Sequence, residues 1–176
     1  QAATAGAELT GYRVCTDRIY ASDLIRTAET AVLIAESMYG PEIIKEPGLR
    51  EMSLGEWDGV PIREIKDQYP ELYRKHKKRG NPQKGGQRDH TSFKLDNDSE
   101  SFYDLQYRVV KTVKKILTED ENADIIIVAH SGVIKVLQSY IYGTPLLHEV
   151  KKPISHGQVT VLTFPKNSAL YAFNAK

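Results

Sequence analysis

Hydrophobic residues run without interruption through residues 125–128 of this chain, where four branched aliphatic side chains follow one another. A continuous apolar run of this length is typical of a strand that is buried on both faces, as in a parallel sheet covered by helices. Polar residues return at His130, and apolar positions at helical spacing begin at Val133. Ligands of open α/β sheets bind beyond the carboxyl ends of the strands. The pattern therefore places His130 at a candidate binding edge, although a helix-capping turn with an incidental histidine has the same pattern.

The rest of the chain alternates between short strand patterns and longer helical patterns. Apolar spacing predicts helices over residues 1–9, 22–38, 62–69, 102–117 and 131–141. Strands are predicted at residues 18–21, 43–44, 124–129, 159–164 and 170–173, the last two as a hairpin. Gly11 is the expected C-cap of the first helix, and Ser22 or Asp23 the expected N-cap of the second. Residues 49–59 are predicted to form a turn-rich loop, and Gly143 to break the chain.

Residues 74–98 differ in composition from the rest of the chain. Apolar side chains nearly vanish there, glycine and proline appear, and lysine and arginine outnumber aspartate. We expect a basic, flexible insertion or cap inside one domain, and a long irregular segment of this kind is usually functional or disordered. It could cover a polyanionic substrate, or it could be a solvated surface loop.

Composition narrows the class of protein further. The 176 residues fit a single domain, and the net charge of +1 indicates no particular partner. Cys15 is the single cysteine, which excludes an internal disulfide framework and fits a cytoplasmic location. No apolar run has the length of a membrane span and no signal peptide is visible, so no membrane partner is expected. No metal and no cofactor is expected either, because no ligand cluster has recognisable spacing.

Three polar side chains follow predicted strands and together suggest one chemistry. They are Arg26, Glu51 and His130. Each alone has a structural explanation, as a surface cation, a solvated loop acid or a capping residue. Together they supply what phosphoryl transfer needs: a guanidinium that binds phosphate oxygens, an imidazole that donates to the transferring group, and an acid that protonates the leaving oxygen.

Four motifs in the chain resemble those of the histidine phosphatases, the phosphoglycerate mutase-like superfamily. They are residues 19–31 (IYASDLIRTAETA), residues 49–59 (LREMSLGEWDG), residues 99–102 (SESF) and residues 128–134 (VAHSGVI). The order of the motifs matches that of the family, and they cover nearly the whole chain. The resemblance implies a three-layer α/β/α sandwich with a mostly parallel central sheet, and catalysis through a phosphohistidine.

The resemblance also assigns roles to individual residues. Arg26 would clamp the phosphate, and Glu51 would act as acid and base on the leaving group. His130 would be the second, non-nucleophilic histidine of the phosphate pocket, and Ser131 would add its backbone N–H at a helix N-terminus.

The chain departs from the family in one important respect. The family's nucleophile lies in an N-terminal Arg-His-Gly segment, which does not occur in residues 1–176, and His76, His90, His148 and His156 stand in other contexts. That segment includes a strand from the middle of the family's sheet, and its loss would leave buried backbone groups unpaired. We therefore expect residues 1–176 to be one N-terminally incomplete domain, unable by itself to form a phosphohistidine.

The predicted function is hydrolysis of a small-molecule phosphomonoester. Residues 54–59 resemble the phosphatase branch of the family more than the mutases, although mutase-type phosphoryl transfer stays open. Two further alternatives are a pseudo-enzyme without the nucleophile, and a module that binds a polyanion through residues 74–94. Nucleic acid is an unlikely partner, because this basic run has no interleaved aromatic residues for base stacking.

Overall fold

The computed structural model describes residues 1–38, 40–78, 90–92, 94–120, 124–163 and 169–174. Its strands are β1 (Arg18–Ala21), β2 (Glu42–Lys45), β3 (Asp124–Ala129), β4 (Val159–Thr163) and β5 (Ala169–Asn174). Its α-helices are α1 (Ala2–Gly11), α2 (Ile25–Ser37), α3 (Ile62–Gln68), α4 (Pro70–Lys78), α5 (Phe102–Glu119), α6 (Ser131–Tyr142) and α7 (Leu146–Glu149). Short 3₁₀ turns are η1 (Pro47–Leu49), η2 (Gly55–Trp57) and η3 (His90–Ser92). The predicted alternation of strands and helices is confirmed.

The strands form one mostly parallel sheet in the order β2-β1-β3-β5-β4. Strand β1 pairs in parallel with both β2 and β3, and β5 pairs in parallel with β3. Only the β4–β5 pair is antiparallel among the described strands, which confirms the predicted hairpin. Strand β3 lies in the middle of the sheet, so its carboxyl end delivers His130 to the centre of one sheet edge.

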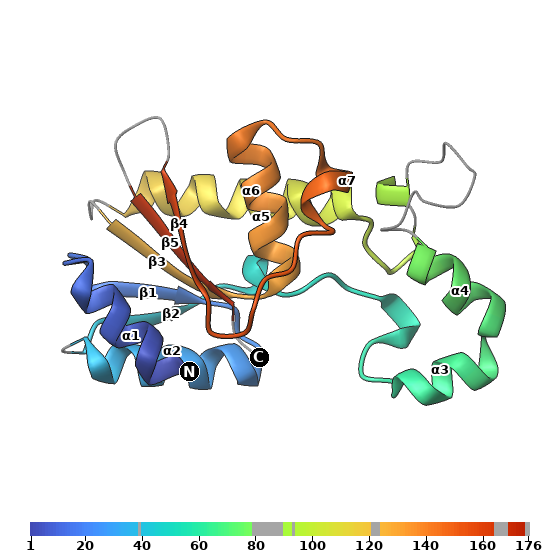
Figure 1. The fold of residues 1–176 in the computed structure, drawn as a ribbon, viewed down its shortest axis with the longest axis horizontal. Helices are drawn as coiled ribbons and strands as arrows, with labels where there is room; N and C mark the ends of the chain where they lie inside the picture. The colour runs from blue at the N-terminus through green and yellow to red at the C-terminus, as the bar shows by residue number, and fades with distance from the viewer. Residues whose placement is uncertain (39, 79–89, 93, 121–123, 164–168, 175–176) are drawn as a thin grey trace.

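Helices cover both faces of the sheet, as the uninterrupted apolar run predicts. Ile125 and Ile127 of β3 pack in a core with α5 and α6. Ile126 and Val128 point to the opposite face, where they pack with α1 and α2. Figure 1 shows these two helix pairs on either side of the sheet. The alternation of side chains along a strand requires both faces of β3 to be apolar, and the predicted three-layer α/β/α sandwich is confirmed.

Strand β3 has a neighbour on both of its edges. Residues Asp124–Ala129 pair in register with Ala169–Asn174 of β5, and Ile126 to Val128 pair with β1. The expectation that buried backbone groups in the middle of the sheet lack partners is therefore wrong for β3, because β1 and β5 pair with its two edges.

The start of α2 differs from the prediction. The helix begins at Ile25 with Leu24 as its N-cap, and no side chain caps it. Asp23 instead accepts two hydrogen bonds from the guanidinium of Arg50, at 2.7 and 2.5 Å. Ser22 turns its hydroxyl toward the end of β3, as described below. The predicted capping by Ser22 or Asp23 is wrong because both side chains have partners outside the helix.

Other helix ends follow local sequence signals more closely. Helix α1 ends at Gly11, but Tyr12 rather than Gly11 is its C-cap. Gly143 ends α6 with a φ of +62°, in the left-handed region that glycine adopts without strain. Helix α5 begins with a capping box between Ser101 and Asp104. The turn that starts α5 is thereby fixed next to the loop of residues 49–59.

The basic segment 74–98 is more regular than predicted. Residues 74–78 form the end of α4 and residues 90–92 form η3, so the expected irregular structure is wrong for these parts. Residues 79–89 and 93 lie outside the described residues. Near the end of the segment, Asp96 accepts hydrogen bonds from the backbone N–H groups of Glu56 (3.1 Å) and Ser99 (2.6 Å). Asp96 thus ties this segment to η2.

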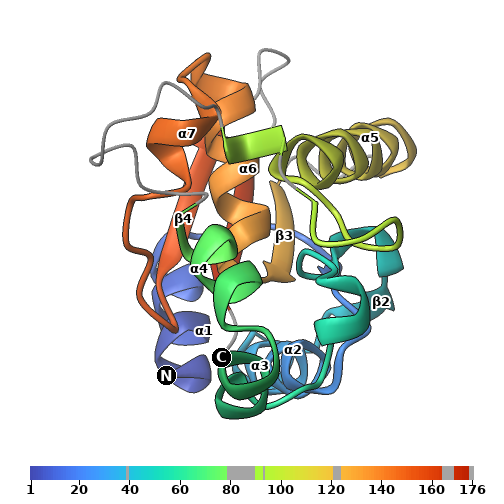
Figure 2. The same ribbon diagram turned by 90° about the vertical axis from the view of Figure 1, so that its right-hand side faces the viewer.

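Helices α3 and α4 form an arm that extends from the sandwich. Figure 1 shows the arm on the side toward which the arrow of β1 points, and Figure 2 shows it in front of the sandwich. The ring of Trp57 in η2 lies 6.2 Å from that of Tyr69 and 6.4 Å from that of Tyr73, centroid to centroid. The arm therefore packs on the same loop that carries Glu51. Within the described ranges, no helix combines the length and the apolar character needed to cross a membrane.

Candidate active site

His130 connects the carboxyl end of β3 to the first turn of α6. Its backbone is extended, the residue is only 2% exposed, and it is the N-cap residue of α6 without a side-chain cap bond. Ring atom Nε2 lies 3.0 Å from Oγ of Ser22, and Nδ1 lies 3.0 Å from Nη2 of Arg26. The strand-to-helix junction thus holds the imidazole between two side chains that follow β1.

The hydrogen bonds assign the protonation of His130. A guanidinium can only donate, so Nδ1 accepts from Arg26 and the ring proton resides on Nε2, which donates to Ser22. Burial lowers the pKa of His130 to about 3, and the positive charges of Arg26 and Arg108 add to this effect. The imidazole is therefore neutral. It can donate from Nδ1 to an anion only if Arg26 moves away and Nδ1 gains a proton.

Arg26 lies at the second residue of α2 and its side chain is exposed. The prediction put it one turn into the helix, and it is closer to the start because α2 begins later than expected. Its contact with His130 joins residues 104 positions apart in the chain. The structure therefore brings Arg26 and His130 together, as predicted, and leaves further N–H groups of the guanidinium for a ligand, since arginine has five.

Glu51 is held beside the first turn of α6. Its Oε1 accepts from the N–H of Met52 at 3.0 Å, and its Oε2 accepts from the N–H of Gly132 at 3.2 Å. The N–H groups of a first helical turn have no partner within the helix, so this carboxylate satisfies one of them. A Cβ on residue 132 would lie 2.2 Å from Oε1, so a glycine is needed for this approach. Glu51 and His130 therefore meet at the same helix end.

Arg108 of α5 holds the loop that carries Glu51. Its guanidinium forms a two-bond contact with Glu100, at 2.7 and 2.6 Å. It also donates to the carbonyl oxygens of Gly48 (2.9 Å), Arg50 (3.0 Å) and Glu51 (3.4 Å). Sequence reasoning missed this role. A signal was present, because Glu100 belongs to a recognised motif and Arg108 lies two helical turns after it.

A cavity of about 250 Å³ opens beside Glu51. Its lining residues come from the Glu51 loop, the start of α5, the first turns of α6 and the end of α7: Glu51, Met52, Leu54, Phe102, Ser131, Gly132, Lys135 and Val150. Ser131 thus lines this cavity, and its predicted contact with phosphate stays a prediction. Lys135 was not predicted, although its spacing of four residues from Ser131 puts both on one helix face.

Lys135 is the cation in the wall of this cavity among the described residues. Its Nζ donates to the carbonyl oxygen of Val150 at 3.2 Å. Burial lowers the pKa of Lys135, and the nearby charge of Glu51 partly opposes this shift. The ammonium therefore lies in a partly desolvated place close to the candidate acid.

The remaining histidines contribute nothing to this site within the described residues. His148 and His156 are exposed, and His148 approaches Glu149 at 3.8 Å. The side chains of His76 and His90 lie outside the described part of the structure. In the described ranges, no group of three or more His, Cys, Asp or Glu side chains could hold a metal ion.

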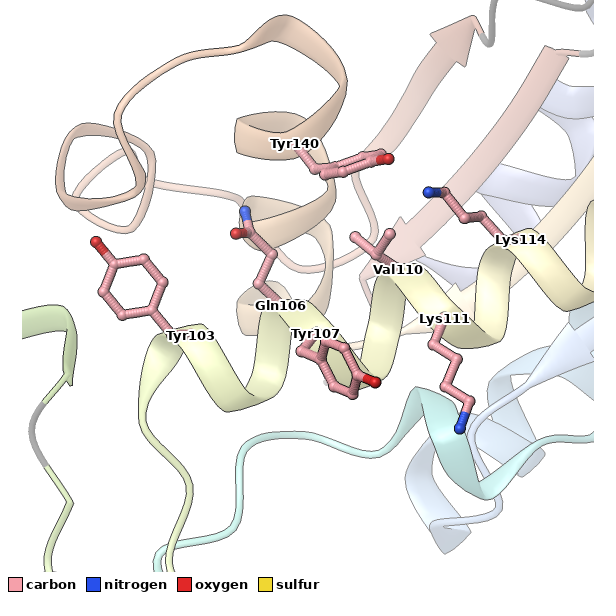
Figure 3. Close-up of a pocket in the computed structure, with 7 residues that line it drawn as sticks. All are labelled: Tyr103, Gln106, Tyr107, Val110, Lys111, Lys114 and Tyr140. Atoms are coloured by element: carbon pink, nitrogen blue, oxygen red, sulfur yellow. The ribbon is translucent and has the colours of Figure 1, made fainter.

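A larger hollow of about 640 Å³ lies on the outer faces of α5 and α6 (Figure 3). It is lined by Tyr103, Gln106, Tyr107, Val110, Lys111, Lys114 and Tyr140. No predicted site residue is among them, and it shares no lining residue with the cavity beside Glu51. Size alone therefore does not identify the functional site in this molecule.

Several curated proteins are similar in sequence to this chain. The chain is 28% identical over 119 residues to the metal-independent phosphoserine phosphatase of Arabidopsis thaliana, covering 68% of this chain and 46% of that protein. It is 29% identical over 134 residues to phosphoglycerate mutase-like protein 4 of the same plant, covering 76% and 53%. The chain thus spans about half the length of these relatives.

Among solved structures, YhfR of Bacillus stearothermophilus matches with a TM-score of 0.73 at 24% identity. The match covers 99% of this chain and 79% of that one, and supports the fold. A model of the histidine phosphatase superfamily (branch 1) matches residues 1–174. The chain belongs to the histidine phosphatase superfamily, branch 1.

Proposed function

We propose that the protein containing this chain hydrolyses small phosphomonoesters through a phosphohistidine intermediate. The observation that supports this most directly is the 3.0 Å contact between Arg26 and His130 at the helix end that Glu51 also binds. A guanidinium, an imidazole and a carboxyl group around one helix N-terminus can bind a phosphoryl group and serve its leaving oxygen.

Arg26, His130 and Ser131 bind the phosphate in this proposal. The phosphate takes N–H groups of Arg26 and the backbone N–H of Ser131, and it approaches Nδ1 of His130 as Arg26 moves off that atom. A nearby dianion raises the pKa of His130, because it offsets the positive charges that lower it in the free protein. The imidazole then gains a proton and donates to the phosphoryl oxygens. This effect grows as negative charge develops in the transition state.

Glu51 serves the leaving group and then the water. In the first step a histidine nitrogen attacks phosphorus, the ester P–O bond breaks, and Glu51 gives its proton to the departing oxygen. In the second step Glu51 takes a proton from water, the water oxygen bonds to phosphorus, and the P–N bond breaks to release phosphate. We propose that the attacking histidine comes from an Arg-His-Gly segment outside residues 1–176.

The relatives support a phosphatase and keep a mutase as the alternative. One curated relative is named a phosphoserine phosphatase and another a phosphoglycerate mutase-like protein. The two reactions differ only in the acceptor of the phosphoryl group. A pseudo-enzyme and a module that binds a polyanion through residues 74–94 stay as further alternatives.

The decisive experiment traps the intermediate in the intact protein. Incubation with a phosphomonoester followed by rapid denaturation should leave an acid-labile, alkali-stable phosphoryl group, mapped to one histidine by mass spectrometry. Release of phosphate into water supports the phosphatase, whereas transfer to an added alcohol acceptor supports the mutase. An intact protein with no phosphoryl group and no turnover would contradict both and favour the pseudo-enzyme.

A further inference from the structure

We infer that the cavity beside Glu51 is a subsite for a carboxylate on the substrate's leaving group, and that Lys135 binds that carboxylate. This inference rests on the proposed function and specifies its substrate class. The cavity shares Glu51 and Ser131 with the proposed reaction centre, so a leaving group that takes its proton from Glu51 extends into it.

The size of the cavity limits the substituent that it can hold. Its volume is about 250 Å³, and a water molecule in the liquid takes about 30 Å³. A leaving group of a few carbon atoms fits into this space, which corresponds to about eight water molecules. Met52, Leu54 and Phe102 give the cavity apolar walls, so polar recognition depends on the few charged groups present.

Lys135 has hydrogen-bonding capacity left for a ligand. An ammonium carries three donors, and in the described part of the chain one of them goes to the carbonyl oxygen of Val150. The carboxylate of Glu51, which lines the same cavity, is already bound by the N–H groups of Met52 and Gly132. A carboxylate on the substrate can therefore take the remaining donors.

The net charge of the cavity wall depends on whether Glu51 carries a proton. With Glu51 ionised, the charges of Glu51 and Lys135 cancel in the cavity wall. The proposed first step needs a proton on Glu51, and this proton removes the negative charge. The wall of the reactive state is then net positive at Lys135, and it attracts an anionic substituent through a charge-assisted hydrogen bond.

Two esters that differ mainly in one carboxylate test the inference. The two esters are 3-phosphoglycerate and glycerol 3-phosphate, and they differ in that the first has a carboxylate where the second has a hydroxymethyl group. A third ester, p-nitrophenyl phosphate, has neither group and reports the chemical step alone. The intact protein should have a kcat/KM at least about 10-fold higher for phosphoglycerate than for glycerol phosphate. The Lys135→Met variant should lose about 10- to 100-fold on phosphoglycerate, mostly in KM, and less than about 3-fold on the other two esters.

Two further variants separate charge recognition from a structural role. Lys135→Arg keeps the charge and should keep most of the preference, while Lys111→Gln removes an exposed lysine of the α5 face and should change nothing (Figure 3). Equal losses on all three esters in Lys135→Met would overturn the inference, because they would mean that Lys135 only supports Val150. A wild-type protein without preference between the matched esters would overturn it too.

Failure of the proposed function is a separate outcome. An intact protein that hydrolyses none of the three esters contradicts the proposed function. The inference is then decided by calorimetric binding of the two matched esters. Tighter binding of phosphoglycerate by about 10-fold, abolished in Lys135→Met, supports the subsite. Equal dissociation constants overturn it.

Discussion

The two halves of the candidate site are built in different ways. The half that we propose to bind phosphate, called the phosphate half, consists of Arg26, His130 and Ser131, with Ser22 against the ring of His130. These residues stand at the ends of β1 and β3 or in the first turns of α2 and α6, and His130 is almost completely buried. The acid half consists of Glu51 on a loop without strand or α-helix, held by Arg108 and by the N–H of Gly132.

Because of this difference, we expect the phosphate half to be rigid and the acid half to be adjustable. Neighbouring parallel strands fix the phosphate half, because β1 and β3 are in register and end side by side. The acid half depends on hydrogen bonds from a side chain to loop carbonyl oxygens, and such bonds break and re-form more easily than a sheet core does. We therefore expect damage to the phosphate half to abolish turnover, and damage to the acid half to change which substrates react.

The largest effect is expected in the phosphate half. Arg26→Ala and His130→Ala in the intact protein should each lower kcat/KM by about 100- to 1000-fold or more, because each removes a group that stabilises transition-state charge. Steady-state hydrolysis of p-nitrophenyl phosphate measures this loss, and His148→Ala, at an exposed position, is the matched control. Near-normal turnover in either variant would remove that residue from the site.

Glu51→Gln should have a smaller effect that depends on the ester. An amide cannot protonate the leaving oxygen, so kcat/KM for an alkyl phosphate should fall by about 100-fold. An aryl phosphate with an activated leaving group should lose less, because its oxygen leaves without a proton. A plot of rate against leaving-group pKa measures the difference. Equal losses across the series would contradict the proton-donor role.

Arg108→Lys should weaken the acid half without removing Glu51. A lysine cannot make the two-bond contact with Glu100 and reach two carbonyl oxygens as well. We expect a loss of about 10-fold in kcat/KM for alkyl phosphates. In a Glu51→Gln background the same change should cost little more, since Arg108 acts through Glu51. Additive losses in the double variant would show that Arg108 has an independent role.

The smallest expected effect is on how the free energy of unfolding depends on pH. The pKa of His130 is lowered from 6.5 to about 3 in the folded chain. Below pH 6.5, His130 therefore binds a proton in the unfolded chain but not in the folded chain. The free energy of unfolding then falls as the pH falls toward about 3. His130 contributes at most about 1.4 kcal/mol per pH unit to this fall.

Denaturant titrations between about pH 4 and pH 6 test this effect against His130→Gln, which removes it. The wild-type curve should be the steeper one, and His148→Gln should behave like wild type. Identical slopes for wild type and His130→Gln would mean that the imidazole titrates normally in the fold. Added phosphate should reduce the difference, because a bound anion raises the pKa of His130.

The sequence predicted the phosphate half better than the acid half, for a physical reason. The aliphatic run before His130 specifies a doubly covered strand, and the end of such a strand has few alternatives. The position of Glu51 depends on contacts between segments far apart in the chain, such as Arg108 with Gly48, and hydrophobic periodicity carries no information on them. Lys135 was missed because it lies within a helix pattern that its apolar neighbours already explained.

The errors have a similar origin. Ser22 and Asp23 have the residue types of helix caps, yet tertiary partners, His130 and Arg50, take their side chains. The segment after Tyr73 is poor in apolar residues, and we therefore predicted a loop there. In the structure, helix α4 of the arm continues to Lys78. In each case a contact that is distant in sequence outweighs a local preference.

The packing of Trp57 on the arm links the position of the arm to the position of the loop that carries Glu51. Trp57 and Glu51 belong to one loop, Tyr69 and Tyr73 rest on that indole, and Asp96 fastens the same loop from the other side. We expect a molecule that moves the arm to move the loop that carries Glu51, the proposed proton donor, as well. Contact between the arm and a distant part of the substrate would then reposition the group that we propose to protonate the leaving oxygen, which is selectivity by induced fit.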